Sequence, residues 1–408
     1  MQTEDAIAPA PTSAPRQRVL SSTFVLAWLI NFAGYFLFYL MVTTMAFYAV
    51  TRFAASDALG GLASSAFVIG ATVARLFAGT ISDRFGRRRV LWVSLILVAA
   101  VCGLYLVTTS LPALIAVRLI HGAAYAFGST ATMSLVQSSL PPARRAEGTG
   151  YFALGTTLAA AVGPALGLFI VNTFDYDALF WLAWITAGAS LVLGLLVRTP
   201  DAPRPDAASR RRFSLRGIIH PAVVPIGVFM LLNGLCYSGV LTYLNVYADQ
   251  RDVLVGASLF FVAYSIVMLV MRFVLGRLQD RRGDNVVMYI GLAGFTAAFG
   301  LISIATADWQ IIVAGALTGL GWGTLMPASQ VVAVNLVPEH RLATGISTLF
   351  LFMDIGTGLG PVVLGAYAAA VGYSVMFASL GGVVVLAGVL YQAVHGRHDV
   401  AKRRVVAG

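Results

Sequence analysis

Charged residues are scarce in this sequence. They make up 11% of the 408 residues, whereas 59% are hydrophobic. Soluble globular proteins carry roughly twice that share of charge, so a water-soluble fold is excluded. Cysteine is rarer still, because Cys102 and Cys236 are the only two. Two distant cysteines are too few for a disulfide framework or a cysteine-based metal site, and we expect both to be buried as small apolar side chains.

The usual signatures of enzymes are also missing. The chain contains no phosphate-binding loop, no metal-spaced set of His and Cys residues and no nucleophile elbow. We therefore predict that the protein is not an enzyme and that it uses neither a cofactor nor a bound metal. Without a loop that could bind ATP, any work on a solute must be driven by an ion or substrate gradient.

Long apolar segments dominate the chain instead. Each is roughly 20 to 25 residues long, enough to cross the hydrocarbon core of a bilayer as a helix. Twelve can be distinguished, at about 20–48, 58–81, 90–109, 112–137, 147–173, 179–198, 221–248, 253–278, 285–306, 309–336, 341–369 and 373–395. The first is too long for the core of a cleavable signal, so we expect an uncleaved first span. The pattern predicts an all-α integral membrane protein with twelve transmembrane helices.

The net charge of +10 is distributed unevenly. If both termini face one side, that side holds 22 of the 27 Lys and Arg residues, and the opposite loops hold only Arg52 and Arg251. This asymmetry follows the positive-inside rule, so we predict a multi-pass protein of a bacterial-type cytoplasmic (inner) membrane with both termini in the cytoplasm. The basic surface then faces anionic lipid, and we expect no nucleic-acid partner.

One motif occurs twice, 197 residues apart. The copies read Arg75-x-x-x-Gly79-x-x-x-Asp83-Arg84-x-Gly86 and Arg272-x-x-x-Gly276-x-x-x-Asp280-Arg281-x-Gly283. The same offset relates Gly122 to Gly319, Pro141 to Pro338, Arg144 to Arg341, Gly148 to Gly345 and Gly163-Pro164 to Gly360-Pro361. A constant offset over most of the chain predicts two halves of six spans each, built to one plan and related by an axis along the membrane normal.

The repeat predicts the domain organisation. We expect five segments: a disordered cytoplasmic tail over 1–19, a six-helix bundle over 20–198, a cytoplasmic linker over 199–220, a second six-helix bundle over 221–396 and a basic cytoplasmic tail over 397–408. The linker contains three prolines and the run Arg210-Arg211-Arg212. Such a polar segment can tether two bundles while they move against each other.

The motif copies resemble the hallmark loop of the major facilitator superfamily, and the resemblance covers essentially the whole chain. The segment Arg118-Leu119-Ile120-His121-Gly122 is similar to the Arg-x-x-x-Gly motif of proton-coupled members. Gly155, followed by Gly163-Pro164-Ala165-Leu166-Gly167, resembles the Gly-Pro motif of the 12-helix drug:proton antiporters, although its recurrence at Gly360-Pro361 is also typical of the repeat alone. The resemblance implies two pseudo-symmetric bundles that rock around a site near the middle of the membrane.

The motif copies are candidate gates. An acid and several cations at a glycine-assisted turn can pair with each other and with a neighbouring helix end, while glycine permits close approach of helices. We predict a latch on the cytoplasmic side, and its residues are Gly79, Asp83, Arg84, Gly86, Arg87, Gly276, Asp280, Arg281 and Gly283. The alternative is that the arginines only fix the topology.

Arg75 and Arg272 lie deeper in the membrane. Each precedes the aspartate of its motif by eight residues, or roughly 12 Å along a helix, where a charge is costly unless it faces protein or water. Two arginines at equivalent places could converge and grip an anion with forked donors, and they are similar in position to the arginines of nitrate/nitrite porters. The alternative is that both snorkel to the interface or bind backbone carbonyls.

Asp354 is the only acid well inside a span. Burial disfavours the ionised carboxylate and makes its protonated form accessible, so the resemblance to proton-coupled transporters makes Asp354 the first candidate proton carrier. We expect Arg118 to tune it, and His121 is a further candidate because imidazole titrates near neutral pH. The alternatives are a structural ion pair of Asp354 with Arg118 or with one of the two deep arginines, and a packing role for His121.

Two further polar pairs are candidates for substrate contact. Asn31 and Tyr35 in the first span, and Asn233 and Tyr237 in the seventh, have the same spacing of four residues, so each pair lies on one helix face. Spans 1 and 7 line the central cavity of the superfamily that this chain resembles. Interhelical hydrogen bonding is the alternative, and the two pairs do not follow the constant offset of the repeat.

These features together predict a secondary active transporter. The leading hypothesis is proton-coupled export of a small anionic, zwitterionic or neutral organic compound, because a single buried acid against three buried arginines fits a lipophilic cation badly. The alternative is an importer or exchanger of a small anion that Arg75 and Arg272 clamp. A non-transporting membrane sensor is the alternative of another class. We expect a monomer whose partners are the substrate, protons and the lipid bilayer.

Overall fold

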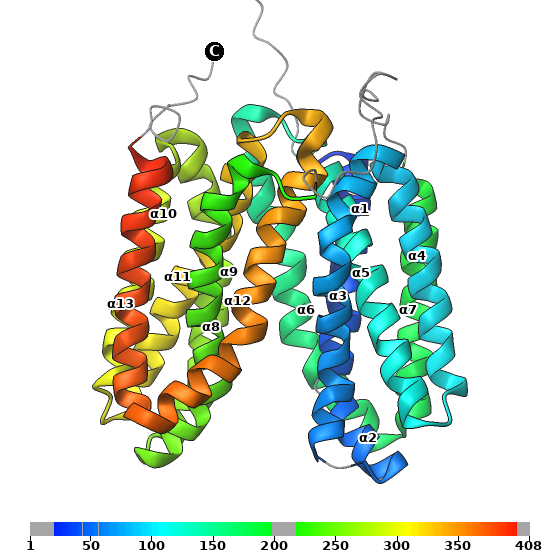
Figure 1. The fold of residues 1–408 in the computed structure, drawn as a ribbon, viewed down its shortest axis with the longest axis horizontal. Helices are drawn as coiled ribbons and strands as arrows, with labels where there is room; N and C mark the ends of the chain where they lie inside the picture. The colour runs from blue at the N-terminus through cyan, green and yellow to red at the C-terminus, as the bar shows by residue number, and fades with distance from the viewer. Residues whose placement is uncertain (1–19, 43, 56, 198–217, 398–408) are drawn as a thin grey trace, which may run out of the picture.

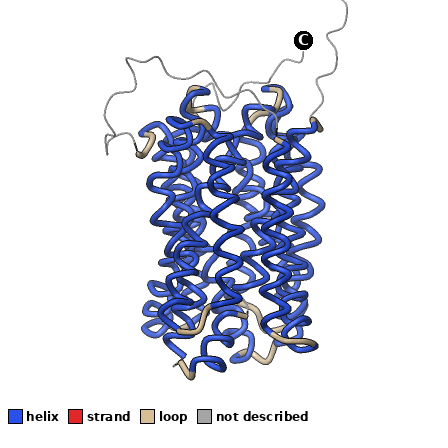
Figure 2. The backbone as a smooth tube through the Cα atoms, turned by 90° about the vertical axis from the view of Figure 1, so that its right-hand side faces the viewer, coloured by secondary structure: helices blue, strands red, loops and turns tan. Residues whose placement is uncertain are grey.

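The computed structural model describes residues 20–42, 44–55, 57–197 and 218–397. Figure 2 shows helices joined by short loops, with no strand in these ranges. Twelve of the described helices are long and apolar enough to cross a membrane. The predicted tail 1–19, nearly all of the tail 397–408 and most of the predicted linker fall outside the described residues, so the predicted domain bounds stay predictions.

The helices form two six-helix bundles that stand side by side (Figure 1). The N-terminal bundle contains α1 (Ser22–Val42), α2 (Met45–Phe53), α3 (Asp57–Phe85), α4 (Arg87–Leu104), α5 (Leu111–Ser139), α6 (Arg145–Thr173) and α7 (Tyr176–Leu196), of which α2 is a short surface helix. The C-terminal bundle contains α8 (Val224–Gln250), α9 (Leu254–Arg282), α10 (Asp284–Ser303), α11 (Asp308–Asn335), α12 (Leu342–Val371) and α13 (Tyr373–Tyr391). Short helical turns are η1 (Tyr105–Val107), η2 (Pro142–Arg144), η5 (Pro221–Val223), η6 (Glu339–Arg341) and η7 (Gln392–Gly396).

The bundles have two ends, which face opposite sides of the membrane. We call the end at which α1 begins (Ser22) and α3 ends (Phe85) the proximal face, which is at the top of Figure 1. The opposite end, where α1 ends at Val42 and α5 begins at Leu111, is the distal face. Each bundle has an apolar core of its own, and large apolar side chains such as Ile185 and Leu386 are exposed on the outside, as a lipid-facing surface requires.

The first predicted span differs from the observed helices. We expected one helix over 20–48, but α1 ends at Val42 and a separate helix, α2, begins at Met45. Thr44 lies between them, and its hydroxyl donates to the carbonyls of Leu40 and Met41. A threonine that bonds back to the preceding turn competes with continuation of the helix. The amino-acid pattern missed this break because both sides of it are apolar.

The repeat is visible in the packing of the helices within each bundle. Gly122 of α5 lies against α3, where an added Cβ atom would stand 1.8 Å from the carbonyl oxygen of Phe67. Gly319 of α11 lies against α9, where a Cβ would stand 2.4 Å from the carbonyl oxygen of Tyr264. Both partners obey the same offset as the glycines. The predicted fold of twelve helices in two pseudo-symmetric bundles is confirmed.

Candidate functional site

The first motif copy caps a helix of the other bundle. The Asp83 carboxylate on α3 accepts hydrogen bonds from the backbone amides of Ala343 (3.1 Å) and Thr344 (2.8 Å), and from the Thr344 hydroxyl (2.7 Å). These are the second and third residues of α12, whose own N-cap, Arg341, makes no capping bond through its side chain. Free amides and the positive end of the helix dipole favour a carboxylate there, so Asp83 supplies the missing cap across the interface.

The second copy does the same in the opposite direction. The Asp280 carboxylate on α9 accepts hydrogen bonds from the amides of Ala146 (3.0 Å) and Glu147 (2.8 Å), at the start of α6. The local N-cap residue, Arg144, again makes no capping bond through its side chain. The two latches therefore join the bundles reciprocally at the proximal face.

The glycines of the motif allow this approach. A Cβ atom on Gly79 would stand 2.5 Å from the Cα atom of Thr344, and one on Gly276 would stand 2.7 Å from the carbonyl oxygen of Ala146. Gly86 and Gly283, which separate consecutive helices, have φ angles of 93° and 83°. Residues with a side chain rarely adopt that conformation, so both positions need glycine for the turn.

The cations of the motif take different places. Arg87 is buried, lies 3.9 Å from Asp83 and donates to the carbonyl of Glu339 across the interface. Arg84 lies over the ring of Phe85 at the surface, and Arg281 is exposed at the end of α9. Of these three, Arg87 alone has a described contact that crosses between the bundles.

A charged network beside the second latch was missed in the sequence. Glu147 accepts from Arg144 of its own bundle (2.7 Å) and from Arg277 of the other bundle (2.9 Å), and Arg277 also donates to the Tyr151 hydroxyl (2.6 Å). The constant offset of the repeat could have revealed it. At that offset, Arg277 corresponds to Thr80 and Glu147 to Thr344. The second latch therefore has two charged residues where the first latch has two threonines.

Apolar side chains close the proximal face below the latches. One cluster contains residues of both bundles, namely Phe24, Ala27, Met133, Val136, Leu140 and Phe152 with Val334, Leu342, Ile346 and Phe350. The hydrogen bonds and ion pairs of both latches, of Arg87 and of Glu147 also lie in the proximal half of the helices. In this structure the bundles are therefore held together at the proximal face.

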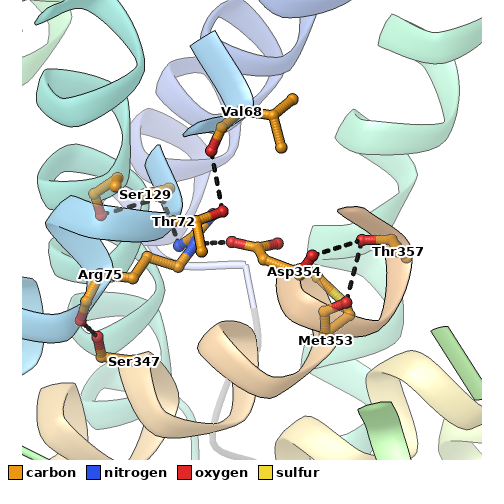
Figure 3. Close-up of polar contacts among 9 residues, drawn as sticks. Val68, Thr72, Arg75, Ser129, Ser347, Met353, Asp354 and Thr357 are labelled. Atoms are coloured by element: carbon orange, nitrogen blue, oxygen red, sulfur yellow. Dashed lines mark hydrogen bonds and ion pairs between the residues drawn. The ribbon is translucent and has the colours of Figure 1, made fainter. Parts of the chain in front are cut away.

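The deepest of these contacts joins Arg75 and Asp354 (Figure 3). The Arg75 Nε atom on α3 donates to the Asp354 carboxylate on α12, and a terminal nitrogen of Arg75 donates to the Ser129 hydroxyl on α5 (3.3 Å). The guanidinium also lies 4.9 Å from the centre of the Phe350 ring. The side chains are only 5% and 15% exposed, so this is a buried ion pair between the bundles.

Arg272 occupies the equivalent place in the second bundle but has no such partner. One terminal nitrogen donates to the carbonyl of Gly323 on α11 (2.8 Å), while its Nε is buried without a hydrogen-bond partner. No acidic side chain pairs with it among the residues that the structure describes. Arg272 is 5% exposed, so its charge is buried and uncompensated, which is costly in the absence of a ligand.

Arg118 lies apart from Asp354. It binds the carbonyls of Ala63 (3.2 Å) and Ser64 (2.9 Å) at the distal end of α3. His121 and the Tyr105 hydroxyl share a hydrogen bond (3.1 Å) inside the N-terminal bundle. Of the two alternative ion pairs of Asp354, the structure contains the one with a deep arginine, Arg75, and describes none with Arg118, which lies at a different depth. The proposed tuning of Asp354 by Arg118 stays a prediction.

The two polar pairs of the first and seventh spans have different surroundings. Asn31 donates to the Thr156 hydroxyl (3.3 Å), and Tyr35 packs edge-on against Tyr125. Asn233 is fully buried and donates to the carbonyl of Phe229 in its own helix, while Tyr237 stacks on Trp322 and shares a hydrogen bond with Tyr264. The pairs are therefore not structural equivalents, and contact with a substrate stays a prediction for all four.

A small cavity connects some of these residues. It encloses about 30 Å³ inside the N-terminal bundle and is lined by Asn31, His121, Tyr125 and Ser129, among others. That is room for about one water molecule. Because Ser129 also accepts from Arg75, this cavity borders the side of the ion pair that lies in the N-terminal bundle.

The Gly-Pro motif serves helix packing. Added Cβ atoms on Gly163 and Gly167 of α6 would stand 2.7 Å from Tyr39 and Leu40 of α1, whereas Gly155 leaves ordinary contact distances to α1. Gly360 of α12 packs still more closely on α8, where a Cβ would stand 1.9 Å from the Ser238 hydroxyl. Pro164 and Pro361 both lie within their helices. The motif thus has matching packing in both repeats. Among the described residues, no group of three or more His, Cys, Asp or Glu side chains could hold a metal ion.

Comparison with known families decides the classification. The family model of the Major Facilitator Superfamily matches residues 27–306 and 254–406. The chain belongs to this superfamily. Members of the superfamily are transporters in the lipid bilayer that bind small-molecule substrates, and they are not enzymes.

Individual members of the superfamily match over most of the chain. The MFS-type transporter YhhS of Escherichia coli K12 is 25% identical over 376 residues, which cover 88% of each chain. MJ1560 of Methanocaldococcus jannaschii is 22% identical over 342 residues, or 82% of this chain and 88% of that protein. Neither relative separates the drug:proton antiporters from other branches, so that assignment stays a prediction.

Two solved structures of the superfamily share the fold. The human organic anion transporter MFSD10 (TETRAN) has a TM-score of 0.79 at 18% identity, over 93% of this chain and 100% of that one. The proton:xylose symporter XylE, bound to 6-bromo-6-deoxy-D-glucose, has a TM-score of 0.73 at 15% identity, over 91% of this chain and 95% of that one. At these identities the likeness shows the fold alone.

Proposed function

We propose that this superfamily member is a proton-coupled secondary transporter that exports a small anionic, zwitterionic or neutral organic compound by alternating access. The observation that carries the proposal is the buried ion pair between Arg75 and Asp354. It places the one deep acid of the chain on the contact between the two bundles. A proton on that acid would therefore change the force that holds the bundles together.

The proposed coupling follows from the charge of the pair. While Asp354 is ionised, its attraction to Arg75 holds α12 against α3 and keeps the proximal face closed. Protonation removes the negative charge and leaves Arg75 without compensation, which weakens the closed state. A proton that enters from the distal side would thus favour opening of the proximal face, where it is released and where the exported compound binds before the return step.

Arg272 supports an anionic or zwitterionic substrate. It is a buried cation without an acidic partner among the described residues, so a carboxylate of the substrate would compensate its charge. The small-anion clamp is the second candidate function. In that version, protonation of Asp354 releases Arg75 to join Arg272 at the anion, and proton and anion travel together. The structural neighbour MFSD10 is an organic anion transporter, which agrees with either version.

We further propose that the proximal face is cytoplasmic. Described basic residues are more numerous at the proximal face than in the distal loops. The proximal face has Arg84, Arg89, Arg281 and Arg282, among others, and the distal loops have Arg52 and Arg251. The positive-inside rule then places the chain termini in the cytoplasm of a bacterial-type inner membrane. We also propose that the monomer is the transport unit, since the interface between the bundles lies within one chain.

Transport in proteoliposomes tests the proposal. A thermal-shift panel of monocarboxylates, amino acids and tetraphenylphosphonium first identifies a ligand, because a ligand stabilises the folded state that binds it. Flux of that ligand is then measured with and without a pH gradient. We expect gradient-driven accumulation by the wild type, and we expect Asp354→Asn to lose the pH dependence while it retains exchange of labelled for unlabelled ligand.

The outcomes separate the alternatives. If Asp354→Asn still couples flux to the pH gradient, Asp354 is not the proton carrier. If anions stabilise the protein, and the effect needs both Arg75 and Arg272, the clamp is favoured. Stabilisation by tetraphenylphosphonium would contradict our substrate class. Binding without flux in either direction would favour the membrane sensor.

A further inference from the structure

An open groove lies on the outer surface of the C-terminal bundle, between α10 and α13 near the proximal face. Its volume is about 540 Å³, within the range of sites that bind small molecules. Tyr289 of α10 forms one wall, and residues 385–397 of α13 and η7 form the rest. None of the residues of the groove belongs to the latches or to the ion pair, so transport as proposed above leaves it without a role.

The membrane end of the groove is apolar and concave. Val385 and Val389 are 52% and 63% exposed, which leaves their side chains free to contact another apolar molecule. Gly388 and Ala393 lie between larger neighbours along the same stretch and provide the hollow. An apolar hollow on the lipid-facing surface of a membrane protein fits a hydrocarbon chain, which has the same chemistry as the surrounding solvent.

The proximal end of the groove offers hydrogen-bond donors. The Nε atom of Arg397 donates to the carbonyl of Ala393 (2.8 Å), so the guanidinium is turned back along the helix. Its terminal nitrogens pair with no acidic side chain among the described residues. Tyr289 donates to the side-chain oxygen of Gln392, which leaves the amide nitrogen of Gln392 as a second donor beside Arg397.

The distance between these two ends matches one leaflet of a bilayer. Val385 and Arg397 are twelve residues apart, or roughly 18 Å along a helix. One leaflet occupies about half of a hydrocarbon core that is about 30 Å thick. The groove therefore runs from acyl-chain depth to headgroup depth. It has an apolar surface at the first depth and, at the second, a cation with no acidic partner among the described residues.

We propose that this groove binds an anionic phospholipid of the proximal leaflet. One acyl chain lies along Val385, Gly388, Val389 and Ala393. The phosphate accepts hydrogen bonds from the Arg397 guanidinium and the Gln392 amide. Arginine suits this role because its planar fork binds two phosphate oxygens at once. The bound lipid touches both α10 and α13 and holds them together at the proximal face.

The test is lipid-dependent stability of the full-length protein. Thermal unfolding in detergent is followed while phosphatidylglycerol or phosphatidylcholine is titrated in, and native mass spectrometry counts the lipids retained. We expect phosphatidylglycerol to raise the melting temperature more than phosphatidylcholine does. Arg397→Ala should remove that preference, and Gly388→Phe should reduce the retention of both lipids because the ring fills the hollow.

Two matched variants control for general effects. Arg251→Ala removes an exposed arginine at the distal face, and Gly382→Phe adds a ring to α13 at a glycine with open space around it and outside the groove. Both should keep the phosphatidylglycerol preference of the wild type. The proposal is overturned if Arg397→Ala keeps that preference, if Gly382→Phe reduces retention as much as Gly388→Phe, or if inorganic phosphate alone stabilises the protein equally.

Discussion

Arg75 and Arg272 occupy the same place in the two repeats, yet their surroundings differ in charge. Arg75 is bound by Asp354 of the opposite bundle, by Ser129 and by the ring of Phe350. Arg272 has the carbonyl of Gly323 as its described hydrogen-bond acceptor, and its Nε has none. Both repeats have an arginine at this depth, but only Arg75 has an acidic partner among the described residues.

The offset of the repeat identifies what changed. The position equivalent to Asp354 is Thr157 on α6, and its hydroxyl donates to the carbonyl of Ala153 in its own helix (3.2 Å). The latches are conserved between the copies in the same structure, because Asp83 and Asp280 cap equivalent residues. Both repeats thus contribute a latch to the closed proximal face. They differ deeper in the membrane, where one arginine is in an ion pair and the other has no acidic partner among the described residues.

The largest expected effect comes from removing the acid that distinguishes the two sites. Asp354→Ala leaves Arg75 buried and unpaired, which should cost about 3–5 kcal/mol of folding free energy. Thr157→Ala, the matched change in the other repeat, removes one hydrogen bond within a helix and should cost about 1 kcal/mol or less. The melting temperatures of both variants in the same detergent measure the difference.

A second variant decides whether charge is the cause. The double substitution Arg75→Met with Asp354→Leu removes both charges, and apolar replacement of a buried pair is often neutral in stability. It should recover most of the loss seen in Asp354→Ala. If it unfolds at the same temperature as Asp354→Ala, the loss comes from packing and the interpretation as an ion pair is wrong.

The next effect comes from supplying the missing acid. Thr157→Asp places a carboxylate where the repeat predicts a partner for Arg272, and a tethered carboxylate competes with an anionic substrate for the same cation. We expect the affinity for that substrate to fall roughly 30-fold, or on the order of 2 kcal/mol. Binding is measured by thermal shift, with Thr157→Asn as the uncharged control. Equal affinity in the two variants would show that the substrate does not use Arg272.

Depth along the helices explains how much of this site was predictable. Arg75 lies ten residues from the proximal end of α3 and Asp354 twelve from that of α12, or roughly 15 and 18 Å. Arg118 lies 21 residues from the proximal end of α5, or roughly 31 Å. The sequence alone could therefore have predicted the pairing of Asp354 with a deep arginine. The depth of Arg118 along α5 excludes it as the ion-pair partner in this conformation.

Other parts of the site depend on packing between helices. The motif and its offset predicted a latch on one face, but the helix ends that Asp83 and Asp280 cap belong to the opposite bundle, which no local pattern reveals. The similar spacing of Asn31 with Tyr35 and of Asn233 with Tyr237 suggested equivalent sites. Rotation of each helix about its axis decides where such side chains point, and Asn233 faces its own helix in a packed core.

The latches should respond to mutation less strongly than the ion pair. Asp83→Asn and Asp280→Asn remove the charge that faces each helix dipole and one of the accepting oxygens, which should cost about 1–1.5 kcal/mol of the closed state. Spin labels on cysteines introduced at Ala143 and Arg282, both exposed at the proximal face, report the separation of the bundles. The native cysteines are buried and should not interfere with labelling.

The expected result is a larger population of long distances between the labels in each variant. Because the two caps are structurally equivalent, the shifts should be similar, with Asp83→Asn the larger since the Thr344 hydroxyl adds a third hydrogen bond to Asp83. A variant whose distance distribution matches that of the wild type would show that its carboxylate does not hold the proximal face closed.

The smallest effect concerns that third hydrogen bond, which the second latch lacks. Thr344→Val removes the hydroxyl with little change in shape, and it should weaken the closed state by about 0.5–1 kcal/mol. The effect should vanish when Asp83→Ala is already present, because no side-chain oxygen at position 83 then accepts from the hydroxyl. The same pair of spin labels measures this coupling in a double-mutant cycle. Additive shifts would mean that Thr344 acts independently of Asp83. In that case the first latch is as strong as the second, and the two repeats differ in the ion pair at Arg75 and in the charged network around Glu147.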